Sequence, residues 1–265
     1  MDDKPNCAVI TGASSGIGWF VAVELAKRGY SIVGVSNQAE ALEKLKSELQ
    51  SKYNINVLTL YCDLSKNDAA EMIFNFCQQK SLEVDVLVNN AGVLVYGEVI
   101  RIDIERTKNI LQLHMDTPAV LCRLFADEMV KNRKGYILNV SSISSVMPFP
   151  VISLYGPTKT FIRHYTKALG FEMKGTGVHV SCLLPGATAT ALYDPKKVNL
   201  ARAIKLGLMK SPEDVANAGV EALFKNKAEC IPGIINKIII LIVPILPHFL
   251  IDYIYRKKKD KLLNY

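Results

Sequence analysis

Short apolar runs alternate with segments of helical periodicity along most of this chain of 265 residues. The apolar runs are continuous, as expected for strands that are covered on both faces. This succession predicts an α/β fold with a parallel sheet between two layers of helices. We expect strands at 7–11, 31–35, 56–61, 84–88, 135–140 and 178–184, and helices at 17–28, 39–52, 68–79, 106–131, 154–174 and 212–224.

Composition places the chain among globular proteins with a large core, since 49% of its residues are hydrophobic and 22% are charged. Six cysteines are scattered without C-x-x-C pairs, so we interpret them as small buried hydrophobes in a reducing compartment. Neither a metal site nor a disulfide framework is indicated. The polar start, Met1–Pro5, leads directly into a strand, so we expect no signal peptide and a cytoplasmic protein.

The formal net charge of +7 comes mainly from the end of the chain, where Arg256, Lys257, Lys258, Lys259 and Lys261 cluster. The rest of the chain is nearly balanced. A nucleic-acid-binding protein would need a basic stripe on its folded body, so we expect no nucleic-acid partner.

A glycine-rich turn follows the first predicted strand and opens a helix. Glycines let the backbone approach a ligand closely, and the helix N-terminus offers unpaired N–H groups to a pyrophosphate. The spacing G-x-x-x-G-x-G lacks the Gly-Lys-Ser/Thr of a nucleoside-triphosphatase loop. It therefore predicts a dinucleotide site; the expected binding residues are Gly12, Ser14, Ser15, Gly16, Ile17 and Gly18.

Two further polar segments end predicted strands at the same edge of the sheet, where open α/β sheets bind ligands. Asp63 could accept a hydrogen bond from the adenine amino group, and Leu64 could support the ring. Asn90, Ala91 and Gly92 follow the fourth strand, where small residues would let a ribose approach the backbone. Both segments strengthen the prediction of a dinucleotide site.

A tyrosine and a lysine four residues apart, Tyr155 and Lys159, lie on one face of a predicted helix. An ammonium beside a phenol favours the ionised phenol, which makes the tyrosine a better acid. Ser142 lies upstream on the end of the preceding strand. Taken alone, the tyrosine and lysine could equally be an ordinary surface pair, and their weight comes from the cofactor motifs before them.

Taken together, these motifs resemble those of the short-chain dehydrogenase/reductase family across about residues 6 to 225. The matching elements are TGASSGIG at 11–18, DL at 63–64, NNAG at 89–92, NVSS at 139–142, YGPTK at 155–159, and PG at 185–186 with Thr190. The resemblance implies a three-layer Rossmann fold with a seven-stranded, doubly wound parallel sheet. It also implies hydride transfer between a nicotinamide and a carbonyl or hydroxyl carbon.

The resemblance assigns roles to single residues. Tyr155 would be the general acid in reduction, Lys159 would lower its pKa and hold the nicotinamide ribose, and Ser142 would donate a hydrogen bond to the carbonyl oxygen. Ser141 is the neighbour that would face away. Tyr155 and Lys159 would thus also bind cofactor, together with Pro185, Gly186, Thr188 and Thr190.

One position departs from the family pattern, because His114 stands where the family usually has an asparagine. An imidazole could serve in a proton relay through water to Lys159, and it would then titrate near neutral pH. The alternative is a histidine that is satisfied within its helix and has no catalytic part. Thr158, inside the YGPTK motif, receives no role.

The predicted second strand ends at Ser36 and Asn37, without the acidic residue that would bind a ribose diol or the arginine that would bind a 2′-phosphate. Since no carboxylate repels the phosphate, Ser14, Ser36 and Asn37 could donate hydrogen bonds to it. We therefore favour NADP(H) over NAD(H).

The segment at 187–210 carries many apolar residues, which favours a lid over a lipophilic substrate; packing of the segment on its own core is the alternative. Residues 146–150 would line the same pocket. The stretch 141–192 resembles the branch of very-long-chain 3-oxoacyl-CoA reductases, 17β-hydroxysteroid dehydrogenases and 3-ketosphinganine reductases. The resemblance implies a lipophilic ketone, or the matching secondary alcohol, as substrate.

The chain divides into a catalytic domain, 1–230, and an apolar and basic segment, 231–265. Pro244 and Pro247 would break a helix in the middle of the apolar stretch, so we do not expect it to span a membrane. It could lie in the interface of a membrane, on its inner face, or pack against a second subunit of a homodimer or homotetramer.

Two functions of different classes follow. The first is an NAD(P)(H)-dependent oxidoreductase acting on CH–OH and C=O groups. The alternative is a regulatory scaffold that binds the cofactor without turnover, which the unusual His114 keeps open. The presence of Ser142 favours the enzyme, because binding alone would not require this serine.

Overall fold

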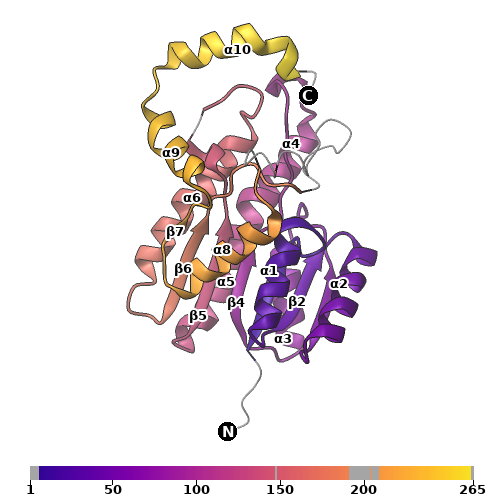
Figure 1. Cartoon of the computed structure of the whole chain (residues 1–265). Coiled ribbons are helices and arrows are strands. Elements are labelled where there is room, and N and C mark those ends of the chain that lie inside the picture. The colour runs from indigo at the N-terminus through magenta and orange to yellow at the C-terminus, as the bar shows by residue number, and fades with distance from the viewer. Residues whose placement is uncertain (1–5, 147, 191–203, 205–208, 264–265) are drawn as a thin grey trace.

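The computed structural model describes residues 6–146, 148–190, 204 and 209–263, with side chains omitted at 254 and 258–263. Its centre is a seven-stranded sheet in which all neighbouring strands are parallel, in the order β3-β2-β1-β4-β5-β6-β7 (Figure 1). The strands are β1 Cys7–Thr11, β2 Ser31–Ser36, β3 Val57–Tyr61, β4 Val84–Asn89, β5 Gly135–Val140, β6 Val178–Leu183 and β7 Glu229–Cys230. This architecture confirms the predicted doubly wound sheet.

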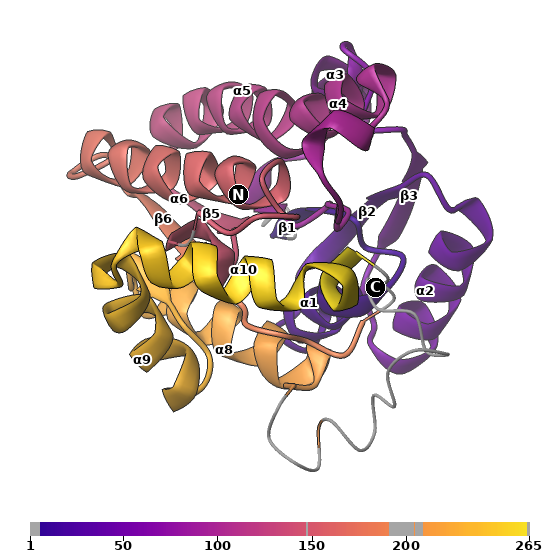
Figure 2. The same ribbon diagram turned by 90° about the horizontal axis from the view of Figure 1, so that it is seen from above.

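The helices form two layers, one on each face of the sheet (Figure 2). One layer holds α1 (Gly16–Lys27), α2 (Ala39–Lys52) and α8 (Pro212–Phe224). The other holds α3 (Ala69–Gln79), α5 (Thr117–Lys131) and α6 (Tyr155–Glu172). Strand β1 shows why both layers form, because Ala8 and Ile10 face the first core while Cys7 and Val9 face the second. Its residues are buried throughout, as its continuous apolar run predicts.

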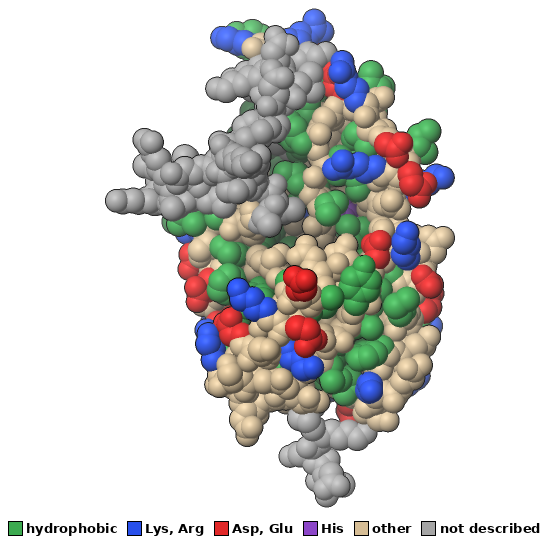
Figure 3. Space-filling view, turned by 90° about the vertical axis from the view of Figure 1, so that its right-hand side faces the viewer, with side chains coloured by type: hydrophobic (Ala, Val, Ile, Leu, Met, Phe, Trp, Pro, Cys, Tyr) green, Lys and Arg blue, Asp and Glu red, His purple; other side chains and the backbone are tan. Residues whose placement is uncertain are grey.

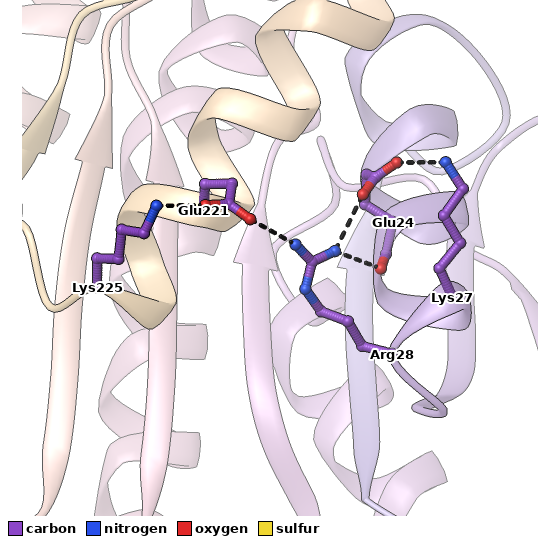
Figure 4. Close-up of polar contacts among 5 residues, drawn as sticks. All are labelled: Glu24, Lys27, Arg28, Glu221 and Lys225. Atoms are coloured by element: carbon purple, nitrogen blue, oxygen red, sulfur yellow. Dashed lines mark hydrogen bonds and ion pairs between the residues drawn. The ribbon is translucent and has the colours of Figure 1, made fainter.

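The first helical layer is pinned by charges at its surface (Figure 4). Arg28, at the end of α1, lies 3.0 Å from Glu24 and 3.1 Å from Glu221 of α8. Burial would raise the pKa of Glu24, but hydrogen bonds from Lys27 and Arg28 outweigh it and lower this pKa. The network joins two helices that are distant in sequence and fixes the helix that begins at the glycine-rich turn.

One predicted helix is interrupted. In place of a single helix at 106–131, the chain forms α4 (Ile104–Leu111), a π-helical turn η2 (Gln112–Asp116) and α5. A π turn holds one extra residue compared with an α-helical turn, and such turns are frequent at functional sites. His114 lies within it and is 1% exposed.

The end of the chain forms α9 (Ile234–Ile242), a short 3-10 turn η4 (Val243–Ile245) and α10 (His248–Leu263). The break falls at the two prolines, as predicted. The strand β7 was not predicted individually, because two residues are too few to show any periodicity. All six cysteines are free and five are buried, in agreement with their interpretation as small core residues.

Candidate active site

The glycine-rich turn between β1 and α1 has a conformation that requires its glycines. Gly12 and Gly16 have φ values of 65° and 57°, which favour glycine. A Cβ on Gly18 would overlap the carbonyl oxygen of Gly12 and the side-chain amide of Asn90. The turn therefore brings its backbone to the N-terminus of α1, where the first N–H groups of the helix lack intrahelical partners.

The end of β4 is fastened to this turn by Thr11 and Asn90. The Thr11 hydroxyl donates to the Val88 carbonyl at 3.2 Å and accepts from the backbone N–H of Asn90 at 2.9 Å and of Ala91 at 3.1 Å. In return, the Asn90 amide donates to the carbonyl of Thr11 at 2.9 Å. These hydrogen bonds place the Asn90–Gly92 segment beside the glycine-rich turn. The sequence did not predict this structural role of Thr11.

The ends of β2 and β3 extend the same edge. The hydroxyls of Ser14 and Ser36 are 2.8 Å apart, while Asn37 is exposed. Asp63 accepts hydrogen bonds from the hydroxyl and backbone N–H of Ser65, which lower the pKa of its carboxyl. The side chain of Leu64 is 6% exposed and packs in the second core rather than lying open at the edge.

These residues fit a dinucleotide. The turn leaves a cradle that any Cβ at Gly18 would fill, and it presents a helix N-terminus to a pyrophosphate. The predicted residues Ser15, Gly16 and Ile17 stand at the first turn of α1. Ser14 and Ser36 offer adjacent hydroxyls where the 2′ position of an adenosine ribose is expected.

The tyrosine and lysine lie in the first turns of α6, with the Lys159 ammonium 5.7 Å from the centre of the Tyr155 ring. The side chain of Lys159 is buried and its Nζ donates to the carbonyl of Val140 at 3.1 Å. Burial lowers the pKa of Lys159 to about 8. The ammonium form therefore predominates at neutral pH, beside the phenol.

The two serines after β5 have different surroundings. Ser141 is 3% exposed, and its hydroxyl donates to the carbonyl of Lys159 at 2.7 Å. The Ser142 oxygen accepts from the backbone N–H of Ser144 at 3.1 Å, which leaves its hydroxyl proton available for donation. Ser141 thus holds the helix, whereas Ser142 can serve a substrate oxygen.

His114 has a partner at each ring nitrogen. Nε2 accepts from the backbone N–H of Val93 at 3.0 Å, so in the neutral ring Nδ1 carries the proton and donates to the Thr158 hydroxyl at 3.0 Å. Burial, followed by the nearby charge of Lys159, lowers the pKa of His114 well below its ordinary value. The imidazole is therefore neutral at neutral pH, contrary to the titration near neutrality that a relay would bring.

Thr158 is the residue that sequence reasoning passed over. It is 1% exposed, accepts from His114 and donates to the backbone carbonyl of Tyr155 at 2.8 Å. The rings of His114 and Tyr155 also meet edge to face, with centroids 5.8 Å apart. A hydroxyl three residues beyond a tyrosine on the same helix face was the available signal, but only the fold brings the histidine to it.

The loop before α6 is held in a strained conformation. Val151 has a φ of 66°, which is unfavourable for a β-branched residue, and its carbonyl accepts from the N–H of Gly97 at 2.7 Å. This bond ties the loop before Tyr155 to the segment after β4. Backbone strain of this kind concentrates at ligand-binding sites.

The segment after β6 reaches the glycine-rich turn. Pro185 and Gly186 follow the strand, the Thr188 hydroxyl donates to the Gly186 carbonyl at 3.0 Å, and Thr190 lies directly against Gly16. Most of the predicted lid, 191–203 and 205–208, lies outside the described residues, as does Met147. Met209, at the far end of the lid, is 6% exposed.

Comparisons with known proteins identify the family. The short chain dehydrogenase family matches residues 6–200. The very-long-chain 3-oxoacyl-CoA reductase of Rattus norvegicus is 35% identical over 73% of this chain and 62% of its own length. The Homo sapiens enzyme of that name is 31% identical over 82% of this chain and 68% of its own. The oxidoreductase YmfI of Bacillus subtilis, whose function is uncharacterised, is 30% identical over 85% and 94%.

Solved structures share the fold. A short-chain dehydrogenase from Sphingobium yanoikuyae in complex with NADPH superposes with a TM-score of 0.78 at 23% identity, over 98% of this chain and 96% of its own. An alcohol dehydrogenase from Thermococcus sibiricus, complexed with 5-hydroxy-NADP, gives 0.73 at 25% identity, over 86% and 96%. With its sheet, its cofactor turn and its tyrosine and lysine in place, this chain belongs to the short-chain dehydrogenase family.

Proposed function

We propose that the protein is an NADP(H)-dependent oxidoreductase that reduces the ketone of a lipophilic substrate, or oxidises the matching secondary alcohol. The observation that carries the proposal is the pairing of Tyr155 with a buried lysine ammonium, together with the hydroxyl proton of Ser142, which is available for donation. The bound nicotinamide supplies or accepts the hydride.

In reduction, Tyr155 gives its phenolic proton to the carbonyl oxygen while the carbonyl carbon receives a hydride, so the ketone becomes an alcohol. The Lys159 ammonium stabilises the tyrosinate that remains. Ser142 donates its hydroxyl proton in a hydrogen bond to the same carbonyl oxygen and so stabilises the negative charge that develops there. Oxidation of the alcohol runs through the same groups in reverse.

His114 acts in this scheme as a positioning residue. Its neutral ring bridges the backbone of Val93 to Thr158, which in turn holds the backbone of Tyr155. Both ring nitrogens are thereby engaged in holding the site together, which favours the satisfied histidine over the proton relay.

The preference for NADP(H) is supported by the paired hydroxyls of Ser14 and Ser36 and by the lack of a carboxylate beside them. Asn37→Asp would introduce one at an exposed position. We expect this variant to lose at least tenfold in kcat/KM with NADPH while NADH is less affected, because the new charge would repel a 2′-phosphate. A wild-type preference for NADH would contradict the cofactor assignment.

The substrate class is supported by the named relatives, the very-long-chain 3-oxoacyl-CoA reductases, and by the apolar residues of the predicted lid. A 3-oxoacyl, 3-ketosphinganine or steroid ketone would fit. Homodimer or homotetramer formation stays a prediction, which light scattering after size exclusion would measure.

The decisive experiment is a screen of ketones with NADPH and of alcohols with NADP⁺, followed by Tyr155→Phe. We expect the phenylalanine variant to bind NADPH normally and to lose at least a hundredfold in kcat, since the proton donor is gone. Tyr165→Phe, on the same helix, is the matched control and should retain activity. Turnover by Tyr155→Phe at the wild-type rate would refute the mechanism.

A further inference from the structure

Exposed apolar side chains gather at the end of the molecule that carries the active site. Of the eighteen large hydrophobic residues that are exposed among the described residues, eight lie between Ile234 and Tyr253 and six between Val93 and Leu111. The most exposed are Ile100 at 87%, Ile245 at 78% and Ile234 at 77%. Apolar patches of this extent mark surfaces that bind a partner or a membrane.

We call the segment from α9 to α10 the arm. Figures 1 and 2 show α10 running across the upper end of the molecule, above the ends of the strands. The base of the arm is docked, because Ile240 packs with Cys182 and Leu184 of the β6 region and the Asn236 amide stands directly against Gly186. The arm therefore begins at the edge of the active site.

The other end of the arm reaches the segment after β4. The hydroxyl of Tyr255 in α10 donates to Glu98 at 3.0 Å. Glu98 precedes the exposed residues Val99 and Ile100. This hydrogen bond links the two exposed apolar groups, which together we call the rim, at the end of the molecule that carries the active site. Ile240 packs inward, whereas Ile235, Leu241 and Phe249 are exposed.

Charge identifies the occupant of this rim. Arg256 and Lys257 are exposed, and the sequence adds Lys258, Lys259 and Lys261 against only Asp252 and Asp260. An apolar surface bordered by cations and tyrosines matches the interface of an anionic bilayer. A symmetric contact with a second copy that is centred on this end of the arm would bring two such basic clusters together, and their repulsion would oppose it. On the side of the molecule in Figure 3, by contrast, acidic and basic side chains are interspersed below the arm.

The shape of the arm suits the surface of a bilayer. Among the described residues, no single helix is long and apolar enough to cross a membrane; one helix pair, Ile234–Ile245 with His248–Lys257, passes on length and composition but is bent by 110°. We propose that the arm and the segment 93–104 bind the surface of an anionic membrane, on its cytoplasmic face, and turn the mouth of the active site toward the lipid. That a ketone enters from the bilayer rests on the proposed function; the binding itself does not.

Flotation of the full chain with lipid vesicles tests the binding. We expect the protein to float with vesicles of phosphatidylcholine and phosphatidylglycerol, and to float less with phosphatidylcholine alone or at high salt. The double variant Ile235→Glu, Leu241→Glu should lower the partition coefficient at least tenfold. The control is Met72→Glu, Phe171→Glu, which alters two exposed residues on α3 and α6 and should float like the wild type.

Equal flotation of the arm variant and the wild type, or no flotation of the wild type with anionic vesicles, would overturn the proposal. A wild-type dimer in solution that Ile235→Glu, Leu241→Glu converts to monomers would also overturn it, in favour of a second copy on the arm. Turnover of a water-soluble ketone is measured in parallel. If turnover is absent while flotation persists, the proposed function is wrong, but the proposed binding to an anionic membrane is supported.

Discussion

The glycine-rich turn and the arm, which both lie at the active-site end of the molecule, are built by different means. In the glycine-rich turn, the backbone itself forms the site. Its conformation is fixed by Gly12 and Gly18 and by the hydrogen bonds between Thr11 and Asn90. On the side of the arm, side chains form the surface, and Ile234, Ile235, Ile238 and Ile242 of α9 are all exposed. A site made of backbone tolerates few residues and can be read as a motif, whereas an apolar surface is defined only by what it contacts.

The sharpest test of the backbone-built side is Gly18→Ala. The added Cβ would overlap the Gly12 carbonyl and the Asn90 amide, so the turn must open. We expect NADPH affinity to fall by about a hundredfold or more, equivalent to about 2.7 kcal/mol. Fluorescence titration of NADPH measures it. Gly170→Ala, where a Cβ meets only ordinary contacts at 3.8 Å, is the control and should bind normally.

The Thr158 hydroxyl bridges His114 and the backbone of Tyr155, and Thr158→Val removes it at nearly constant volume. The buried Nδ1–H of His114 then loses its acceptor, which costs about 1–3 kcal/mol of unfolding free energy. We expect kcat to fall about tenfold, or about 1.4 kcal/mol, with KM for NADPH little changed. Thr158→Ser should restore both quantities; a serine variant as impaired as the valine would show that shape, and not the hydrogen bond, matters.

His114 should make stability depend on pH. The pKa of His114 in the folded protein lies well below that of a histidine in the unfolded chain. Below about pH 6.5 the unfolded chain therefore binds a proton at this histidine and the folded chain does not. The free energy of unfolding then falls as the pH falls, by at most about 2 kcal/mol between pH 6.5 and 5.

Urea unfolding of wild type and His114→Asn at pH 7 and pH 5 isolates this contribution, and the asparagine variant should lose it. His164→Asn, at an exposed position, serves as control. We also expect His114→Asn to keep its activity within about tenfold, since an amide oxygen can accept from Val93 as the imidazole does. A loss of activity greater than tenfold would show that His114 has a role in the reaction that asparagine cannot perform.

The smallest effect belongs to the surface clamp between α1 and α8. Glu221→Gln removes the charge that Arg28 meets across the two helices. Because Glu221 and Arg28 are partly exposed, we expect only a small loss of unfolding free energy, measured by urea unfolding and reduced at high salt. NADPH affinity should not change. A loss of unfolding free energy as large as that of Thr158→Val would mean that this ion pair contributes more to holding α1 against α8 than an exposed pair normally does.

The positions of six strands and of most helices along the chain were predicted from the sequence because buried parallel strands leave continuous apolar runs. The cofactor-binding residues stay a prediction, but the structure shows a turn in which Gly12 has a positive φ and Gly18 leaves no space for a Cβ. The π turn escaped prediction because 112–116 looks like ordinary helix, and Thr158 escaped because its partner lies forty-four residues away. The support of an adenine ring by Leu64 stays a prediction, and its place in the motif did not reveal that its side chain packs in the second core.

The extra residue in the π turn at Gln112–Asp116 also sets the rotational phase of α5 relative to α4. If the same residues were wound as an unbroken α-helix, everything beyond the turn would rotate by about 100° relative to α4. Either the core face of α5, with Leu121 and Phe125, or the buried face of α4, with Ile110, would then point away from its present neighbours. The wide turn is therefore what lets α4 and α5 bury these faces at the same time, although the sequence there looks like ordinary helix.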